Sequence, residues 1–305
     1  MTRYHSNGKF LLTSEYLVLK GALALALPLK LGQSLEVEEL ETNKDQLHWE
    51  AFRPEGKWFS VSLDRENPAN YSTVNPEKAK RLSEILQAVK QLNPKAFEGN
   101  DLQFTTRLDF DPNWGLGSSS TLIVNLARWA NVNPYELLKL TFGGSGYDIA
   151  CATAEQPIYY QLIDGKPQFE TVDFRPPYAD HLFFIYQGQK QSSYKEIKAF
   201  LAKANPADVQ KDIEAVSEIS RAVPKCETLN EFALLMQCHE RIISRCIGQE
   251  PVQKRFPDFE GTLKSLGAWG GDFILAATEW DESQVKAYFK KKGLEVIFGY
   301  KDIVK

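Results

Sequence analysis

The sequence predicts an α+β protein with two domains. Strand-like alternation recurs over residues 10–63, which indicates an antiparallel sheet near the N-terminus. The segment Arg175-Pro176-Pro177 is a candidate linker, and after it strands interleave with helices. A chain of 305 residues is long enough for one large or two ordinary domains. We therefore expect domains over residues 1–176 and 177–305.

The elements of the first domain follow from patterns of period 2 and period 3.6. Strands are expected over residues 10–12, 16–19, 23–29, 35–41, 47–52, 58–63 and 102–110. Helices are expected over residues 77–92, 118–131, 135–140 and 149–154. A hairpin with strands over residues 158–162 and 169–172 should turn at Asp164-Gly165.

The second domain should begin with a strand over residues 181–186. Helices are then expected over residues 194–203, 207–223, 229–247 and 282–291, and strands over residues 273–277 and 294–298.

The composition is that of a soluble globular protein, with 43% hydrophobic and 25% charged residues. A net charge of −4 and a pI near 5.7 give no basic footprint for nucleic acid or an acidic membrane. The apolar stretch over residues 16–29 is too short to span a bilayer, and the N-terminus does not read as a signal peptide. The four cysteines lack Cys-x-x-Cys spacing and should be reduced and mostly buried. We expect a cytoplasmic monomer or homodimer without a nucleic-acid or membrane partner.

The most informative segment is Asp-Pro-Asn-Trp-Gly-Leu-Gly-Ser-Ser-Ser-Thr at 111–121, which runs into an apolar helix. Gly115 and Gly117 lack a Cβ, so their backbone can turn sharply and approach a ligand closely. The serines fall at a helix start, where unpaired N–H groups and a partial positive charge suit phosphate. The alternative is a glycine-rich turn with a serine N-cap. The length of the run favours nucleotide binding.

Two familiar phosphate loops do not fit this chain, since the P-loop pattern is absent and Ser120 stands where the dinucleotide fingerprint needs a third Gly. The segment Gly-Leu-Gly-Ser-Ser at 115–119 instead resembles the central signature of the GHMP kinases. These small-molecule kinases are named for galactose, homoserine, mevalonate and phosphomevalonate. The resemblance extends to three other motifs in matching order along nearly the whole chain. One departure is Pro112, which lies three residues before Gly115, where the family usually has Pro four before.

The resemblance implies a two-domain GHMP kinase fold, with an N-terminal ATP-binding α+β domain and a C-terminal ferredoxin-like domain. The active site would lie in the cleft between them and would use ATP and Mg²⁺. Ser119 would be the protein ligand of Mg²⁺. The phosphates would be cradled by Gly115, Leu116, Gly117, Ser118, Ser119 and Ser120.

Residues 8–29 resemble the N-terminal motif of the family, most closely in its phosphomevalonate kinase version. Lys9 falls at the position of the active-site Lys, which would stabilise charge on the moving phosphoryl group. Considered alone, Lys9 would be a solvated surface lysine. Glu15 aligns with an acidic position and should have a structural role, pairing with a cation or a backbone N–H group.

Residues 143–150 resemble the family element that supplies the catalytic aspartate, here Asp148, which could accept the proton of the acceptor. Ser145 and Gly146 would allow close approach of the substrate beside it. The alternative is a turn in which Asp148 caps the next helix.

Residues 267–275 resemble the third motif, in which Gly270 and Gly271 would lie by the nucleotide phosphates. Asp272 is typical of phosphomevalonate kinases. Trp269 replaces a usual Gly and should narrow the space above the loop, or pack on substrate or base. The alternative for this motif is an ordinary hairpin turn.

Two further features concern the acceptor and the metal. Lys190, Ser192 and Ser193 could hold a carboxylate or phosphate of an anionic acceptor, although a polar loop that caps a helix is an equal alternative. Mevalonate kinases hold magnesium with a Glu eleven residues before the catalytic Asp, where this chain has Leu137. Glu136, one residue away, is the nearest acidic candidate.

The resemblance thus implies a kinase that transfers the γ-phosphoryl of MgATP to mevalonate or 5-phosphomevalonate in isoprenoid precursor synthesis. The N-terminal motif, Asp272 and the missing Glu favour 5-phosphomevalonate, whereas the divergent Gly-Tyr-Asp-Ile-Ala element leaves other acceptors open. Two alternatives are a lyase similar to diphosphomevalonate decarboxylase and a non-catalytic ATP-binding regulator on the same fold.

Overall fold

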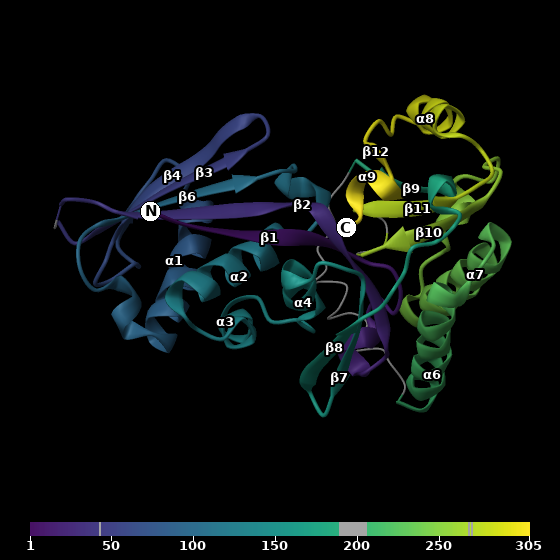
Figure 1. Ribbon diagram of the computed structural model, residues 1–305, viewed down its shortest axis with the longest axis horizontal. Coiled ribbons are helices and arrows are strands. Elements are labelled where there is room, and N and C mark those ends of the chain that lie inside the picture. Colours follow the sequence, from purple (N-terminus) through teal and green to yellow (C-terminus); the bar gives the residue numbers. More distant parts are fainter. Residues whose placement is uncertain (43, 189–205, 268, 270) are drawn as a thin grey trace. The chain divides into compact units, whose positions relative to one another are not determined.

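The computed structural model describes residues 1–42, 44–188, 206–267, 269 and 271–305 (Figure 1). Its contacts divide the chain into two compact units. Unit 1 comprises Met1–Gly8, Leu31–Pro112 and Leu116–Thr153, and unit 2 comprises Lys9–Lys30, Asn113–Gly115 and Ala154–Lys305. The sequence analysis places one boundary at 176–177, whereas in the structure the early segment Lys9–Lys30 groups with the C-terminal residues.

Unit 1 is a twisted sheet with helices on one face (Figure 1). Its strand order is β5 (Tyr71–Ser72), β4 (Gly56–Asp64), β3 (Gln46–Arg53), β6 (Leu102–Leu108) and β2 (Ala24–Glu39), and β1 (Thr2–Leu11) also pairs with β2. The helices are α1 (Pro76–Leu92), α2 (Ser118–Ala130), α3 (Pro134–Thr141) and α4 (Tyr147–Thr153).

The sheet is mixed, because β3 and β4 run antiparallel as expected, whereas β3 and the later strand β6 run parallel. Parallel neighbours need a crossover connection, and α1 lies in the chain between these strands. The buried face of α1 and the inward residues of the strands form the core of unit 1. At its centre Trp49 stacks on Phe104 with ring centroids 5.1 Å apart.

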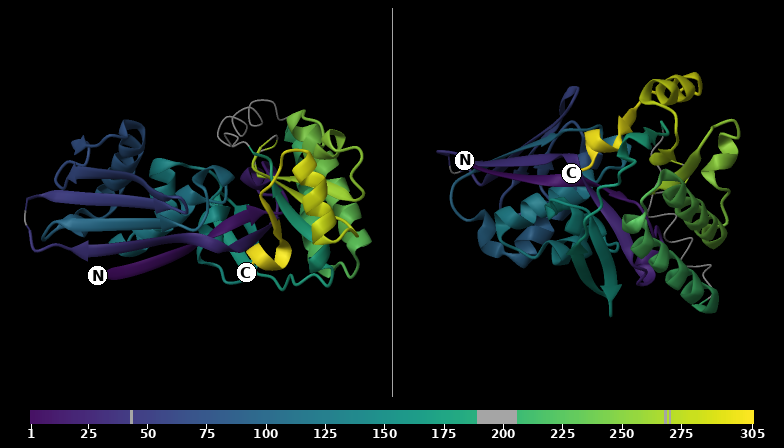
Figure 2. Two further views of the ribbon diagram at one scale, coloured as in Figure 1. Left: turned by 90° about the horizontal axis from the view of Figure 1, so that it is seen from above. Right: turned by 45° about the vertical axis from the view of Figure 1, so that its right-hand side comes forward.

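Unit 2 contains a hairpin and a second sheet. The hairpin of β7 (Ile158–Ile163) and β8 (Lys166–Thr171) turns at Asp164 and Gly165, as predicted, and β7 pairs with the first residues of β2, so the hairpin continues the sheet that contains β2. The second sheet is antiparallel, in the order β10 (Thr262–Leu266), β11 (Phe273–Ala277), β9 (Leu182–Tyr186), β12 (Ile297–Gly299). Helices α6 (Pro206–Ala222) and α7 (Leu229–Ile247) lie side by side (Figure 2), and α7 packs on β10. The remaining helices are α8 (Glu282–Lys291) and α9 (Tyr300–Ile303).

Three expectations about unit 2 differ from the structure or cannot be compared with it. The strand expected over 16–19 is a 3₁₀ helix, Leu17–Lys20, which follows a left-handed Tyr16 with φ 62°. The sequence does not predict strand β10, because its buried residues include the polar Thr262, Lys264 and Ser265 and form neither an apolar run nor an alternation. The helix expected over 194–203 lies outside the described residues.

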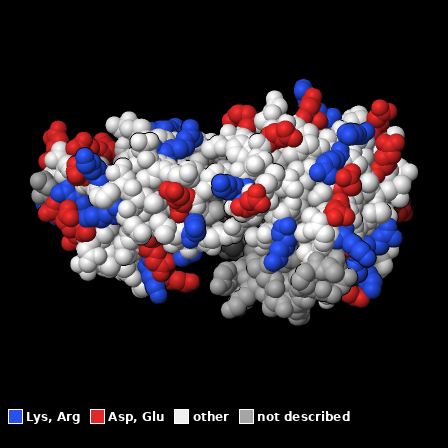
Figure 3. Space-filling view, turned by 90° about the horizontal axis from the view of Figure 1, so that it is seen from below, with Lys and Arg blue, Asp and Glu red and all other residues white. Residues whose placement is uncertain are grey.

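The surface and the cysteines complete the description. On the face shown in Figure 3, acidic and basic side chains are interspersed over the described surface. None of the described helices is long and apolar enough to cross a bilayer. The four cysteines are free, but only Cys151 is buried and Cys238 is exposed, so the expectation of mostly buried thiols is wrong.

Candidate active site

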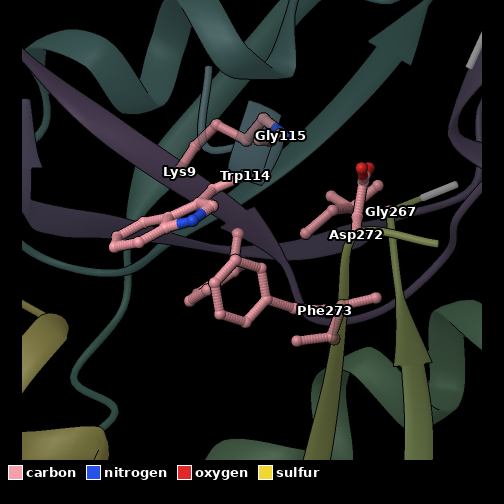
Figure 4. A pocket seen from close by; sticks show the side chains of 9 residues that line it. Lys9, Trp114, Gly115, Gly267, Asp272 and Phe273 are labelled. Atoms are coloured by element: carbon pink, nitrogen blue, oxygen red, sulfur yellow. The ribbon is translucent and has the colours of Figure 1, made fainter. Parts of the chain in front are cut away.

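Three motifs that are far apart in the sequence line one pocket in unit 2 (Figure 4). The pocket is lined by Lys9, Phe10, Leu11, Trp114, Gly115, Leu266, Gly267, Asp272 and Phe273. These residues come from the end of β1, the glycine loop before α2 and the β10–β11 loop. The structure therefore brings together the N-terminal, central and third motifs.

Lys9 is half-buried near the end of β1, and its ammonium donates a hydrogen bond to the carbonyl oxygen of Gly115 at 2.8 Å. The next residue, Phe10, anchors the strand, because its ring stacks on Phe184 at 4.5 Å and meets Phe273 edge-on at 5.1 Å. The alternative of a solvated surface lysine is therefore wrong, since Lys9 carries a positive charge into a pocket beside the glycine loop.

The glycine loop has a backbone that only glycine adopts readily. Gly115 and Gly117 have φ values of 72° and 101°, in the left-handed region. Gly117 is the N-cap of α2, and no side chain caps this helix. The alternative of a serine N-cap is therefore wrong. An uncapped N-terminus of a 13-residue helix fits an anionic phosphate group, because its first N–H groups and its dipole favour negative charge.

The serines of this loop lie in different surroundings. Ser118 is half-buried and Ser119 is exposed at the helix start. Ser120 is 1% exposed, and its hydroxyl donates to the Gly117 carbonyl oxygen at 3.0 Å. Leu116 is equally buried. The side chains of Leu116 and Ser120 therefore support the loop from inside, and only their backbone groups are available to a ligand.

Asp148 belongs to unit 1, in the first turn of α4, and is half-buried. Its carboxylate accepts a hydrogen bond from the N–H of Ile149 at 3.1 Å. The helix begins from a left-handed Gly146, whose carbonyl oxygen accepts from Ile149 and Ala150. Helix α4 packs against α2, so the aspartate helix and the glycine-loop helix are neighbours within unit 1. Ser145, half-buried, precedes Gly146 in the same loop.

Tyr135 on α3 is a neighbour of Asp148 that the sequence did not indicate. Its hydroxyl is buried and has no hydrogen-bond partner among the described residues. Burial raises the pKa of Tyr135 to about 12, with smaller contributions from the charges of Asp148 and Cys151. The phenol therefore stays protonated at neutral pH.

The third glycine loop connects β10 to β11 and is held by a residue that sequence reasoning missed. The amide nitrogen of the Gln187 side chain donates to the carbonyl oxygen of Gly271, and the backbone N–H of Gln187 donates to that of Asp272 at 2.8 Å. The Gln187 amide oxygen accepts from Arg255. Its only sequence signal is its place next to Gly188. Gly270, Lys190, Ser192 and Ser193 lie outside the described residues.

The two tryptophans of the glycine loops lie in different surroundings. Trp269 is 2% exposed and packs in a core cluster with Tyr16 and Ile243, and its backbone N–H donates to the Tyr16 hydroxyl at 3.1 Å. The expectation that it narrows the site or packs on a ligand is therefore wrong. Trp114, which the sequence analysis did not single out, lines the pocket and meets Phe298 edge-on at 5.5 Å.

Glu15 has the structural role that was expected for it. It is 2% exposed and accepts a hydrogen bond from the ammonium of Lys264, which is 1% exposed. His239 lies 3.5 Å away and accepts from the backbone N–H of Ser14 at 2.7 Å, so its imidazole is neutral. Burial raises the pKa of Glu15 to about 7 against the opposing effect of Lys264, and burial together with Lys264 lowers the pKa of His239.

The acidic side chains suggest no dedicated metal cage. Leu137 is fully buried in the core of unit 1, and Glu136 is exposed on α3. Within the described part of the chain, no three His, Cys, Asp or Glu side chains are grouped to hold a metal ion.

Comparison with known proteins yields likeness in structure only. No family model and no curated protein matches the sequence. The mevalonate kinase of Methanococcus jannaschii has a TM-score of 0.72 at 17% identity, covering 97% of this chain and 96% of that chain. A Streptococcus pneumoniae phosphomevalonate kinase, solved with phosphomevalonate and AMPPNP, gives 0.68 at 17% identity over 98% and 100%. The D-glycero-D-manno-heptose 1-phosphate kinase of Bacteroides thetaiotaomicron gives 0.67 at 14% identity over 99% and 95%. This chain has the two-domain fold of the GHMP kinases.

Proposed function

We propose that the protein is an ATP-dependent kinase that transfers the γ-phosphoryl group to a small-molecule acceptor. The observation that carries the proposal is the pocket in which the Lys9 ammonium is bonded to the glycine loop beside the third glycine loop. A cation at this position suits charge that develops on a phosphoryl group in transfer. The fold shared with solved kinases supports the same activity.

ATP would bind through the glycine loop. Gly115 and Gly117 provide close backbone approach, and the uncapped start of α2 provides N–H groups for phosphate oxygens. Ser118 and Ser119 add hydroxyls at the same helix start, with Ser119 the proposed ligand of Mg²⁺. Magnesium, when bound, would neutralise phosphate charge. Gly270 and Gly271 of the third loop are proposed to lie by the phosphates as well.

Two charged side chains would have different roles in the transfer reaction. Asp148 would accept the proton of the acceptor hydroxyl or orient that hydroxyl, and Lys9 would stabilise negative charge on the phosphoryl group. Ser145 and Gly146 would border the acceptor, as would Lys190, Ser192 and Ser193. These roles are assigned from the motif resemblance together with the local geometry.

The acceptor is proposed to be mevalonate or 5-phosphomevalonate, in isoprenoid precursor synthesis. The motifs support this choice, and similar structures include kinases of mevalonate and phosphomevalonate. A heptose-phosphate kinase of comparable similarity makes a sugar phosphate the second acceptor class to test. We propose a cytoplasmic location on the basis of the four free cysteines. A monomer and a homodimer both fit the proposal.

The test is ADP release from ATP, measured by a coupled assay with mevalonate, 5-phosphomevalonate and a heptose phosphate offered separately. Acceptor-dependent ADP release by the wild type, reduced at least about 10²-fold in Asp148→Asn, would support the kinase and name its acceptor. Asp173→Asn, at an exposed carboxylate paired with Arg175, is the matched control and should keep full activity.

The rival functions give other products. A lyase would release CO₂ and inorganic phosphate, and a regulator would bind ATP without turnover. Either result would replace the kinase assignment.

A further inference from the structure

We propose that Asp272 is the carboxylate that holds the divalent cation of the bound nucleotide. The inference rests on the proposed kinase function and concerns the same pocket. It assigns the acidic ligand that position 137 does not supply, because Leu137 is buried in the core of unit 1.

The geometry places the Asp272 carboxylate against both glycine loops. A Cβ added to Gly115 would lie 2.6 Å from Cγ of Asp272 and 2.7 and 2.8 Å from its two carboxylate oxygens. A Cβ added to Gly267 would lie 3.1 Å from Oδ2. The missing side chains at these two glycines therefore make room for this carboxylate. Figure 4 shows its oxygens directed toward the side of the pocket where Gly115 lies.

The backbone holds the carboxylate in this place. Asp272 has φ 48°, a left-handed conformation that Asp and Asn tolerate better than most residues. Gln187 binds the backbone on both sides of it, through the carbonyl oxygens of Gly271 and Asp272. Arg255 in turn holds the Gln187 amide. Asp272 is 7% exposed, so its position is determined by packing as well as by the backbone.

The negative charge of the Asp272 carboxylate determines which ligand it can bind. Gly115 leads within three residues to the start of α2, where the nucleotide phosphates are proposed to bind. The described pocket holds one cation, the Lys9 ammonium, and a carboxylate next to phosphates that carry several negative charges needs a further cation between them. Magnesium commonly takes one or two carboxylates together with phosphate oxygens and water, which turns this repulsion into attraction. Asp272 is the one acidic residue among those that line the described pocket.

The experiment measures the binding of ADP by isothermal titration calorimetry, with Mg²⁺ and separately with EDTA. Asp272→Asn is the informative variant, because Asn accepts the left-handed backbone and removes only the charge. We expect MgADP to bind this variant about tenfold more weakly than the wild type. Metal-free ADP should bind it more tightly than the wild type, since the repulsion is gone. Asp180→Asn, at an exposed carboxylate paired with Lys301, should change neither affinity.

The opposite changes expected for the affinities of MgADP and metal-free ADP distinguish a cation ligand from other roles of Asp272. A merely structural Asp272 would weaken both forms of ADP alike, and that result would overturn the proposal. Unchanged affinity for both forms, with a raised KM for the acceptor, would overturn it in favour of an acceptor contact. If the wild type binds neither form of ADP, the kinase function itself fails. A different result is that the wild type binds MgADP and turns over ATP while ADP binding by Asp272→Asn depends on Mg²⁺ as in the wild type. That result would overturn the role of Asp272 and leave the kinase function standing.

Discussion

Lys9 and Glu15 lie on the same N-terminal segment, yet their charged groups have opposite surroundings. Lys9 is half-buried and borders a pocket, where its ammonium contacts a backbone carbonyl oxygen of the glycine loop. Glu15 is sealed in the core of unit 2 against Lys264 and His239. Both residues belong to the segment that resembles the N-terminal motif of the GHMP kinases. Burial separates them, because the half-buried Lys9 ammonium borders a pocket, whereas the Glu15 carboxylate, 2% exposed, is paired inside the protein.

The comparison predicts that substitution of Lys9 lowers activity more than stability, and that substitution around Glu15 lowers stability. The largest effect is expected for Lys9→Met, which should lower kcat about 10³-fold, or ~4 kcal/mol, because charge on the phosphoryl group loses its cation. The unfolding free energy should stay near the wild-type value. Single-turnover kinetics and urea unfolding measure the two quantities. Lys20→Met, at an exposed lysine, is the control for charge alone. If the unfolding free energy fell by as much as the activation free energy rose, Lys9 would be a structural residue like Glu15.

The second prediction concerns the buried pair. Lys264→Met should lower the unfolding free energy by about 3 kcal/mol, because it leaves Glu15 buried without its cation. Urea unfolding of the wild type and the variant checks this. Lys292→Met removes a cation from the exposed pair with Asp258 and should cost less than about 1 kcal/mol. Equal effects of the two substitutions would show that burial does not set the strength of the Glu15 pair.

The smallest effect is a pH dependence with two opposite signs. The folded protein holds a proton on Glu15 between pH 4.5 and about 7, where the unfolded chain has released it, so this group makes stability fall as pH rises. His239 stays neutral in the fold below pH 6.5, where the unfolded chain protonates, so it makes stability fall as pH falls. Lys264 and Glu240 also face this cluster, and burial raises the pKa of Glu240 in the same direction as that of Glu15.

Replacing Glu15 or His239 alone should therefore change the pH dependence of the unfolding free energy in opposite directions between pH 4.5 and 6.5. Relative to the wild type, His239→Gln should change the slope of stability by about −1.4 kcal/mol per pH unit, and Glu15→Gln by about +1.4. Urea unfolding across this range measures both slopes. Wild-type slopes in both variants would mean that neither group changes its protonation on folding in this range.

Much of the architecture was predictable because its elements carry local patterns. The bounds of α7 and α8 match the expected residues, since their apolar periodicity and their capping boxes are encoded within the segments themselves. The bounds of β11 also match, because its five residues form one continuous apolar run. The sequence does not indicate strand β10, because Thr262, Lys264 and Ser265 interrupt its apolar residues although all five are buried. The apolar residues over 16–19 predict a strand, yet Leu17–Lys20 forms a 3₁₀ helix between Tyr16 and Gly21, which both have positive φ.

The candidate site divides in the same way. Motif spacing indicates Lys9 and Gly115, and in the structure both line one pocket, while their roles stay predictions. The roles of Asp148 and of Lys190, Ser192 and Ser193 stay predictions. Trp114 and Gln187 were missed, because their contacts are with residues distant in the sequence and no local pattern marks them.

By itself, the sequence determined the fold class, the order of most elements and the glycine-rich segments, because propensity, periodicity and backbone permissiveness act over a few neighbouring residues. Only the tertiary structure decided that Trp269 packs in the core, that Lys264 pairs with Glu15, and that the Asp272 carboxylate lies against Gly115. These outcomes depend on which distant segments share a buried volume. Burial and long-range pairing are properties of the packed chain, and no window of sequence contains both partners.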